Sequence, residues 1–322
     1  MERLKRTEKN KLTERVLQFG EGNFLRGFVD WMIDKLNKEN GGDYGVIIVQ
    51  PLAGGLVDKL NAQDGRYSLY LRGLLKGEKV EETRIVDCVT RGINPYTNTD
   101  EFFDCAKNPD LRFIVSNTTE AGSEYKPNQN PDDFNGLTFP GRLTLFMKKR
   151  FDEGLGGFIL LPCELIDKNG DNLKECILKY SEDWGYGGEF EKWIETENHF
   201  TNTLVDRIVT GYPRDNAKEM EQSYGYLDDM IDTAEIFHLW VIEGDKKLAE
   251  EIPFHKIGLN VLWTDDVTPY KKRKVRILNG AHTMTVLAAH LAGLETVKDA
   301  MDDELVFTFM KQGIFEEIIP TL

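Results

Sequence analysis

The sequence lacks any apolar run close to the roughly 20 residues that a membrane helix needs. Its longest apolar stretches, residues 157–162 and 286–294, have the length of core segments. Residues 1–12 are charged and contain no apolar stretch of the kind found in secretory signals. We therefore expect a cytoplasmic protein with no membrane partner.

Cysteine is scarce, and its spacing excludes the common zinc motifs. The four cysteines, at positions 88, 105, 163 and 176, stand far apart, without a CxxC pair or a Cys/His cluster. Scattered thiols suit a reducing compartment, where disulfides are rare. We predict no metal site and no disulfide framework.

Positive charge is scarce as well. The chain has 40 Lys and Arg against 55 Asp and Glu, a formal net charge of -15. Binding to nucleic acid depends largely on Lys and Arg that neutralise phosphates, so no nucleic-acid partner is expected. The exception is a local cluster of positive charge, which we call the basic island. It is either the solvated start of a helix or a site for an anion. It consists of Lys271, Lys272, Arg273, Lys274 and Arg276.

The 322 residues, of which 40% are hydrophobic, suffice for one large domain or two ordinary ones. Up to about residue 189, short β-rich runs alternate with helical patterns, which favours βαβ units and a mostly parallel sheet. The predicted strands are 15–19, 46–49, 66–71, 84–89, 111–116 and 158–161, and the predicted helices are 23–37, 142–151 and 172–180.

After residue 189 the strand signal fades. Helical patterns cover 190–209, 229–239, 271–291 and 296–315, with an irregular stretch at 211–224 and a strand or buried connector at 257–263. The predicted fold is α/β. A Rossmann-type dinucleotide-binding domain over residues 12–250 precedes a mainly helical domain over 251–322. The apolar C-terminal end suggests that this second domain is truncated.

A Gly-x-Gly pair lies between the first predicted strand and the first predicted helix. Gly20 allows a tight turn, Gly22 lets backbone approach a phosphate, and the following helix start favours an anion. The usual third glycine is replaced by Leu25, and Gln50 stands where the ribose-binding acid is expected. The pattern is therefore either a dinucleotide site or an ordinary strand–helix turn, and it does not separate NAD from NADP. Arg26, on the helix, either contacts the phosphates or faces solvent.

Polar residues also follow the mostly apolar strand at 111–116. Asn117, Thr118, Thr119 and Glu120 would lie at the carboxyl end of a parallel strand, the edge at which such sheets bind ligands. Taken alone, the same residues would equally suit a capped loop.

Near the C-terminus, Lys274, Asn279 and His282 share one predicted helix. At about 100° per residue they fall at 0°, 140° and 80°, so one flank carries an amine, an amide and an imidazole. Each residue alone is more typical of a surface or a core position. The spacing Lys-x4-Asn-x2-His, however, resembles that of the mannitol dehydrogenase family, the polyol-specific long-chain dehydrogenases.

The resemblance extends along the whole chain. The turn at 20–27, with Asn23, Phe24 and Arg26, is similar to the family's phosphate loop, and 118–122 is similar to its nicotinamide-side segment. Residues 205–209, including Asp206 and Arg207, resemble a further signature on the wall of the substrate cleft. Residues 17–34, 161–165 and 275–285 are most similar to the branch that acts on sugar acids.

The resemblance implies the chemistry of the site. It implies NAD as cofactor, Lys274 as general acid/base, Asn279 as a donor to the oxyanion and His282 as the residue that positions the substrate. A lysine that is partly desolvated beside other cations loses its proton more readily, and an amide donor stabilises an alkoxide without a metal. The implied substrates are tagaturonate and altronate, whose carboxylate Arg276 or the rest of the basic island would bind.

Two features depart from the family's pattern. Polyol members often have an asparagine after the Cys-acid pair, whereas Leu165 follows Cys163-Glu164 here, and neither Glu164 nor Asn169 can be assigned as its substitute. The chain also ends soon after the catalytic helix. Three hypotheses stay open: the implied sugar-acid reductase, a sibling enzyme acting on fructuronate, mannitol or a phosphorylated polyol, and a non-catalytic dinucleotide-binding domain. The oligomeric state is also open.

Overall fold

The computed structural model describes residues 1–8, 11–75 and 77–322. They form two compact units, residues 1–265 and 266–322. The division predicted from the sequence lies after residue 250. The difference arises from 251–265, whose strand β12 (Val261–Thr264) pairs with β11 (Leu239–Glu243) of the first unit.

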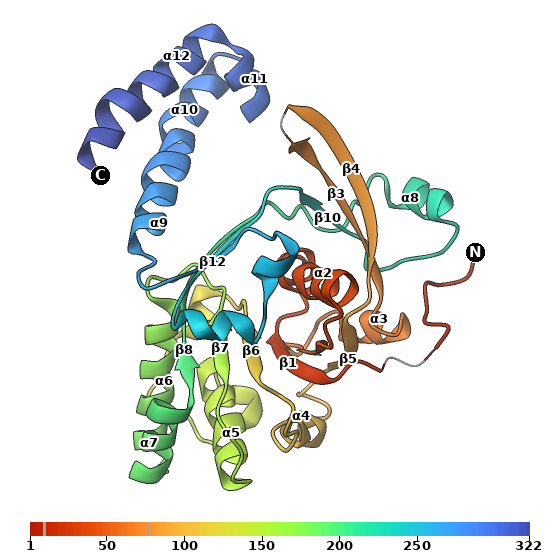
Figure 1. The fold of residues 1–322 in the computed structure, drawn as a ribbon, viewed down its shortest axis with the longest axis vertical. Coiled ribbons are helices and arrows are strands. Elements are labelled where there is room, and N and C mark those ends of the chain that lie inside the picture. The colour runs from red at the N-terminus through yellow and green to blue at the C-terminus, as the bar shows by residue number, and fades with distance from the viewer. Residues whose placement is uncertain (9–10, 76) are drawn as a thin grey trace. The chain divides into compact units, whose positions relative to one another are not determined.

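The first unit is built on a six-stranded parallel sheet (Figure 1). Its strands are β5 (Val89–Ile93), β2 (Gly45–Val49), β1 (Glu14–Phe19), β6 (Phe113–Ser116), β7 (Ile159–Pro162) and β8 (His199–Phe200), in that spatial order. Renumbered within the sheet, the order is 3-2-1-4-5-6, the order of dinucleotide-binding folds. The predicted α/β Rossmann-type fold is confirmed.

Alternate residues of the strands enter two cores on opposite faces of the sheet. Val16, Ile48 and Val115 belong to one core, and Leu17, Ile47 and Ile114 belong to the other. The first face is covered by the helical stretch α1 (Asn23–Leu25), η1 (Arg26–Asp30) and α2 (Trp31–Asn40). The second is covered by α4 (Thr99–Cys105), α5 (Phe139–Asp152), α6 (Asn169–Asp183) and α7 (Gly188–Glu197).

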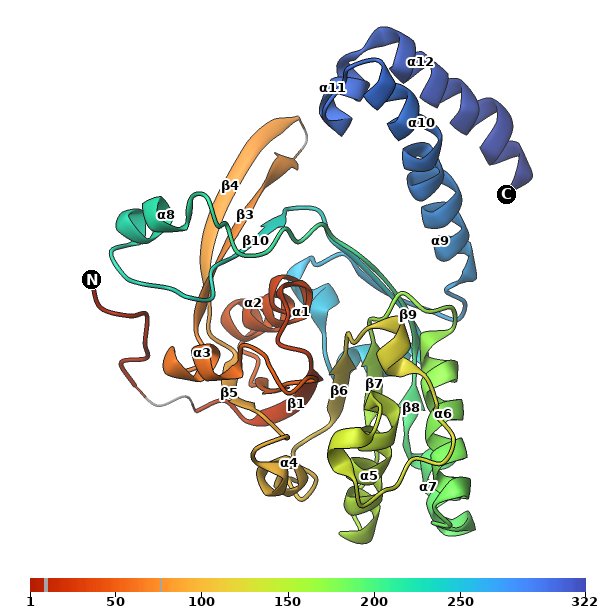
Figure 2. The ribbon, with the colours of Figure 1, turned by 180° about the vertical axis from the view of Figure 1, so that it is seen from behind.

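Two smaller sheets complete the first unit. One joins the long antiparallel hairpin of β3 (Tyr67–Leu75) and β4 (Glu78–Val86) to β10 (Asp232–Glu235), and the other joins β12, β11 and β9 (Asn202–Asp206). The hairpin extends away from the main sheet (Figure 2). The remaining helical segments are α3 (Val57–Ala62), η2 (Glu120–Ser123), η3 (Phe134–Gly136), α8 (Ala217–Tyr224), η4 (Lys246–Glu250) and η5 (Phe254–Ile257).

The structure corrects three expectations after residue 189. The predicted helix over 190–209 ends at Glu197, and β8 and β9 follow it. The predicted helix over 229–239 is β10 and the start of β11, and the irregular stretch at 211–224 contains α8. Strand pairing decides the outcome here, because β10 pairs with β3, more than 150 residues earlier in the chain, and local periodicity does not report such contacts.

The second unit is helical. One stretch runs through α9 (Thr268–Arg273), η6 (Lys274–Asn279) and α10 (Gly280–Leu291). It is followed by α11 (Val297–Asp302), α12 (Glu304–Gln312), η7 (Gly313–Ile318) and η8 (Ile319–Thr321). We call residues 268–291 and 297–321 the two arms of this unit. They approach closely at Gly313, where a Cβ would lie 2.4 Å from Met284 Sδ.

Candidate active site

The glycine turn (residues 20–22) lies at the carboxyl edge of the main sheet. The Gly20 amide donates to Val49 O, at the end of β2, at 3.0 Å. Gly20 has a φ of +127°, a conformation that side chains rarely permit. No atom lies within 4 Å of the place that a Cβ on Gly22 would take. The turn thus stands at the switch point between β1 and β6, where open α/β sheets bind ligands, with room for close approach at Gly22.

The missing third glycine has a structural explanation. Leu25 is buried, and its Cδ1 lies 3.3 Å from the Cβ position of Gly20. Close packing of the helix occurs two residues later, because a Cβ on Gly27 would lie 2.9 Å from Val209 Cγ1 and 3.2 Å from Asp232 Oδ2. The helix therefore needs its glycine at position 27, where it packs against the segment around β10.

Arg26 is buried, so the interpretation that it faces solvent is wrong. Its Nε donates to Glu21 O at 3.1 Å, Nη1 to Met230 O at 2.6 Å and Nη2 to Asn23 Oδ1 at 2.8 Å. The guanidinium also lies 4.9 Å from the ring centre of Tyr67. These contacts hold the turn from inside the unit, and a contact between Arg26 and a phosphate stays a prediction.

Asn23 and Phe24 also shape the turn. A Cβ on Gly211, which has a φ of +83°, would lie 2.3 Å from Asn23 Nδ2, so this close approach requires glycine. The half-buried ring of Phe24 stacks on Phe28, with ring centres 5.1 Å apart. Contacts of Asn23 and Phe24 with a dinucleotide stay a prediction.

A buried carboxylate organises the carboxyl ends of β6 and β7. Glu164 accepts hydrogen bonds from the Thr118 amide at 2.9 Å and from Ser116 Oγ at 3.1 Å. Burial raises the pKa of Glu164. Asn117 Nδ2 donates to Cys163 O at 2.8 Å, and the Thr119 side chain caps η2. The structure thus brings the predicted polar loop to the same edge as the glycine turn; the side chain of Glu120 lies outside what the structure describes.

Glu164 and Asn169 are polar residues close in sequence to Leu165, which stands at the position of the second oxyanion donor. The Glu164 carboxylate accepts hydrogen bonds from the β6 loop. Asn169 Nδ2 donates to Pro162 O at 2.9 Å and to Glu164 O at 3.1 Å. Leu165, between them, is exposed. Both polar side chains therefore have structural partners in this region, and the second oxyanion donor is not assigned.

Sequence reasoning missed Glu21, the residue between the two glycines. Its carboxyl group is buried at the turn, and Oε1 accepts from the Leu56 amide at 3.4 Å. Desolvation raises its pKa. The signal in the sequence is the acid between the two glycines, whereas a ribose-binding carboxylate is usually expected at the end of the second strand.

Asp206 and Arg207 lie at the end of β9. Arg207 is buried, with its guanidinium 4.0 Å from the ring centre of Trp31, and it donates to Gly27 O at 2.8 Å and Glu235 O at 2.8 Å. Burial lowers the pKa of Arg207 to about 10. Arg207 therefore braces the helix that follows the glycine turn. Asp206 is half-buried and pairs with Leu239 of β11.

In the second unit, Lys274, Asn279 and His282 lie on one helical stretch, as predicted. Residues 274–279 are a π-helix, in which the Gly280 amide bonds to Val275 O, five residues back. A π-turn takes one residue more than an α-turn, so Lys274 and Asn279 come closer to one face than the 140° of a regular α-helix implies. π-segments of this kind occur frequently at functional sites. Arg276, Asn279 and His282 are exposed.

His282 also lines an apolar cavity of about 570 Å³ between the arms of the second unit. Ile277, Thr285 and Met310 are among the other lining residues. One wall of this cavity thus carries an imidazole and a hydroxyl among apolar side chains.

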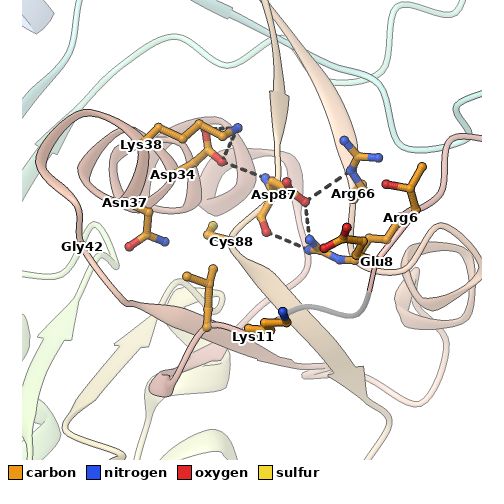
Figure 3. Close-up of a pocket in the computed structure, with 12 residues that line it drawn as sticks. Arg6, Glu8, Lys11, Asp34, Asn37, Lys38, Gly42, Arg66, Asp87 and Cys88 are labelled. Atoms are coloured by element: carbon orange, nitrogen blue, oxygen red, sulfur yellow. Dashed lines mark hydrogen bonds and ion pairs between the residues drawn. The ribbon is translucent and has the colours of Figure 1, made fainter.

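A separate polar pocket of about 430 Å³ lies near the amino ends of β1 and β5 (Figure 3). Its wall includes the ion pairs of Asp87 with Arg6 and Arg66, and of Asp34 with Lys38. Its lining charges are largely neutralised by one another, and it lies at the sheet edge opposite to the glycine turn. Because open α/β sheets bind ligands at the carboxyl edge, this pocket is not the expected cofactor site.

Among the described residues, no group of three or more His, Cys, Asp or Glu side chains is arranged to hold a metal ion. Within the same part of the chain, no helix combines the length and apolarity needed to cross a membrane.

Two family profiles cover almost the whole chain. The profile of the mannitol dehydrogenase Rossmann domain matches residues 14–256, and that of the mannitol dehydrogenase C-terminal domain matches residues 266–322. The chain belongs to the mannitol dehydrogenase family. The family prediction from the sequence is confirmed.

Relatives and solved structures agree with this assignment. Altronate oxidoreductases of Cronobacter sakazakii and Shigella flexneri are 48% and 49% identical to the chain over 314 residues, 96% of this chain. The chain spans 65% of the length of these relatives. A substrate-free D-sorbitol dehydrogenase matches 97% of this chain and 66% of its own, with a TM-score of 0.82 and 25% identity. A Pseudomonas fluorescens mannitol 2-dehydrogenase in ternary complex with NAD and D-mannitol matches 97% and 65%, with a TM-score of 0.79 and 22% identity.

Proposed function

We propose that this chain is an NAD(H)-dependent oxidoreductase acting on CH–OH groups, with tagaturonate and altronate as the ketone and alcohol of its reaction. The observation that carries the proposal is the glycine turn at the switch point of a sheet with the strand order of dinucleotide-binding domains. Family membership and the identity to altronate oxidoreductases support the reaction and the substrate class.

The residues of the turn fit a dinucleotide. The backbone conformation of Gly20, the open space at Gly22 and the start of a helix at Asn23 are the features that a pyrophosphate requires. The loop of Asn117, Thr118 and Thr119, held by Glu164, stands at the same edge and would border the nicotinamide end.

The nicotinamide, when bound, gives or takes the hydride. In oxidation, Lys274 accepts the proton of the substrate hydroxyl while the adjacent C–H bond loses its hydride; in reduction Lys274 returns that proton to the ketone oxygen. Asn279 donates to this oxygen as negative charge develops on it, and His282 positions the neighbouring hydroxyls. Arg276, within the basic island, binds the carboxylate of the sugar acid.

The test is oxidation of NADH, followed by its absorbance, with tagaturonate, fructuronate and fructose offered in parallel. We expect turnover on tagaturonate. We expect Lys274→Ala to lower kcat by about 10²- to 10⁴-fold, since general acid–base catalysis contributes that much, with NADH affinity unchanged. Lys311→Ala removes an exposed lysine of the same unit, outside the basic island, and is the matched control.

Each alternative outcome indicates a different function for this chain. Turnover confined to fructuronate or fructose indicates a sibling polyol or sugar-acid dehydrogenase. NADH binding without turnover on any of the three substrates indicates a dinucleotide-binding domain that does not catalyse this reaction. Equal loss in Lys274→Ala and Lys311→Ala would refute the assignment of Lys274 as the acid/base.

A further inference from the structure

Gln50 occupies the end of β2, where dinucleotide-binding folds usually place the acid that binds the adenosine ribose. Its side chain is buried, and Nε2 donates to Leu52 O at 2.7 Å and Ala53 O at 3.1 Å. Oε1 accepts from the Val57 amide at 3.4 Å. The amide of Gln50 is therefore committed to the loop that follows its own strand.

Glu21 reaches the same loop from the glycine turn. Its Oε1 contacts the Leu56 amide, and a Cβ on Gly55 would lie 2.3 Å from Glu21 Oε1 and 2.5 Å from Gln50 Oε1. Gly55 is thus the point at which the two side chains meet, and a Cβ there would have to displace at least one of them. A carboxylate therefore stands between the ends of β1 and β2, although neither strand end carries an acid in the usual position.

The carboxylate of Glu21 can accept further hydrogen bonds. The residue is 8% exposed, and Oε2 is buried without a hydrogen-bond partner. The hydrogen bond from the Leu56 amide to Oε1, at 3.4 Å, is long. A buried acceptor of this kind is costly unless a donor reaches it. The loop that Glu21 contacts includes Ala53, Gly54 and Gly55, which are small and exposed.

We infer that Glu21 binds the hydroxyls of the adenosine ribose and makes this chain select NAD(H) over NADP(H). This rests on the proposed function, since it names how that site recognises its cofactor. A carboxylate accepts hydrogen bonds from a vicinal diol and repels a 2′-phosphate. Residues 50–58 include no Lys or Arg, so the loop offers a 2′-phosphate no cation.

The test measures dinucleotide affinity by calorimetry on the 322-residue chain, independently of turnover. NADH and NADPH are titrated into the wild type and into two variants, Glu21→Gln and Asp58→Asn. The glutamine of the first variant keeps an acceptor for the Leu56 amide. Asp58, two residues after Leu56, is exposed, and its substitution removes a charge of the same sign. We expect the wild type to prefer NADH. Glu21→Gln should narrow that preference by about tenfold or more, mainly through weaker NADH binding, while Asp58→Asn leaves it unchanged.

A second comparison tests the contribution of the ribose 2′-hydroxyl alone. ADP and 2′-deoxy-ADP are titrated into the wild type and Glu21→Gln; the wild type should bind 2′-deoxy-ADP about tenfold more weakly, and the variant should bind both alike. If Glu21→Gln does not fold, the wild-type pair still decides, because equal affinities overturn the inference.

The remaining outcomes separate the inference from the proposed function. Equal weakening of NADH and NADPH by Glu21→Gln would mean that Glu21 only fastens the loop, and the inference fails while dinucleotide binding stands. A wild type that binds neither dinucleotide overturns both.

Discussion

The guanidinium of Arg26 joins three segments of the first unit. It donates to the backbone of the glycine turn, to Met230 before β10 and to the side chain of Asn23. It also lowers the pKa values of two buried carboxyl groups, Asp30 and Asp232, which burial raises. The helix after the glycine turn is thus held by one buried cation, which donates to the turn and to the segment before β10.

We expect Arg26→Met to lower the free energy of unfolding by about 3–5 kcal/mol, because it leaves buried acceptors without their donor and removes the positive charge that acts on two buried carboxyl groups. Urea unfolding measures this loss. The matched control is Arg72→Met, which removes an exposed arginine from β3. A loss below about 1 kcal/mol for Arg26→Met would contradict this role.

Asp30 gives stability a specific pH dependence. Burial, partly offset by hydrogen bonds from Gln18 and Tyr67, raises its pKa to about 7. The unfolded chain ionises Asp30 near pH 4. Between these values the folded chain keeps a proton on Asp30 that the unfolded chain has released. The contribution of Asp30 to the free energy of unfolding therefore becomes less favourable as pH rises, up to about pH 7.

Asp30→Asn should remove that dependence. Relative to wild type, the variant should gain stability from pH 4 to 7, by up to about 4 kcal/mol, since one pKa unit corresponds to about 1.4 kcal/mol. Above pH 7.5 the difference should level off. Urea unfolding at several pH values gives the curve. A difference that is constant with pH would show that Asp30 is already ionised in the folded chain at acidic pH.

At the scale of elements, the two glycines Gly22 and Gly27 have different tasks. A Cβ at Gly22 meets no protein atom, whereas one at Gly27 meets Val209 and Asp232. We expect Gly22→Ala to leave the unfolding free energy within about 0.5 kcal/mol of wild type and to weaken NADH binding. Gly27→Ala should cost about 1–3 kcal/mol through overpacking. Unfolding and binding measured on both variants check this, and the reverse pattern would contradict it.

The elements that sequence reasoning found are those with local signals. β1, β2, β6 and β7 are short buried apolar runs, and the helix from Asn23 follows a glycine turn. β10 was missed because its residues, Asp232–Glu235, are mostly polar and form a strand only through pairing with β3. No window of sequence contains that partner.

The same distinction holds for the candidate site. The predicted positions at Gly20, Gly22 and Asn117 do lie at one edge of the sheet, because chain order places them after parallel strands. The burial of Arg26 and Arg207 was not predictable, since each depends on partners about 200 or 30 residues away, Met230 and Glu235. Glu21 was overlooked because its neighbour Gly55, which lets it reach the loop after β2, is distant in sequence.

At the scale of the whole molecule, the proposed cofactor residues and the proposed acid/base belong to different units. Residues 20–26 and 117–120 lie in residues 1–265, and Lys274, Asn279 and His282 lie in residues 266–322. All five tryptophans of the chain lie at or before position 263, within the first unit. Tryptophan fluorescence therefore reports the first unit, while circular dichroism reports the helices of both.

This division predicts how the cofactor stabilises the chain. Saturation with NAD⁺ at 100 times its Kd should stabilise the unit that binds it by about 2.7 kcal/mol. The unfolding transition seen by tryptophan fluorescence should therefore move to higher denaturant concentration. We expect Lys274→Ala to show the same shift, because its substitution leaves the dinucleotide site intact, and Gly22→Ala to show a smaller one. An NAD⁺-dependent shift that disappears in Lys274→Ala would instead assign that lysine to cofactor binding, and its role as acid/base would have to be argued anew.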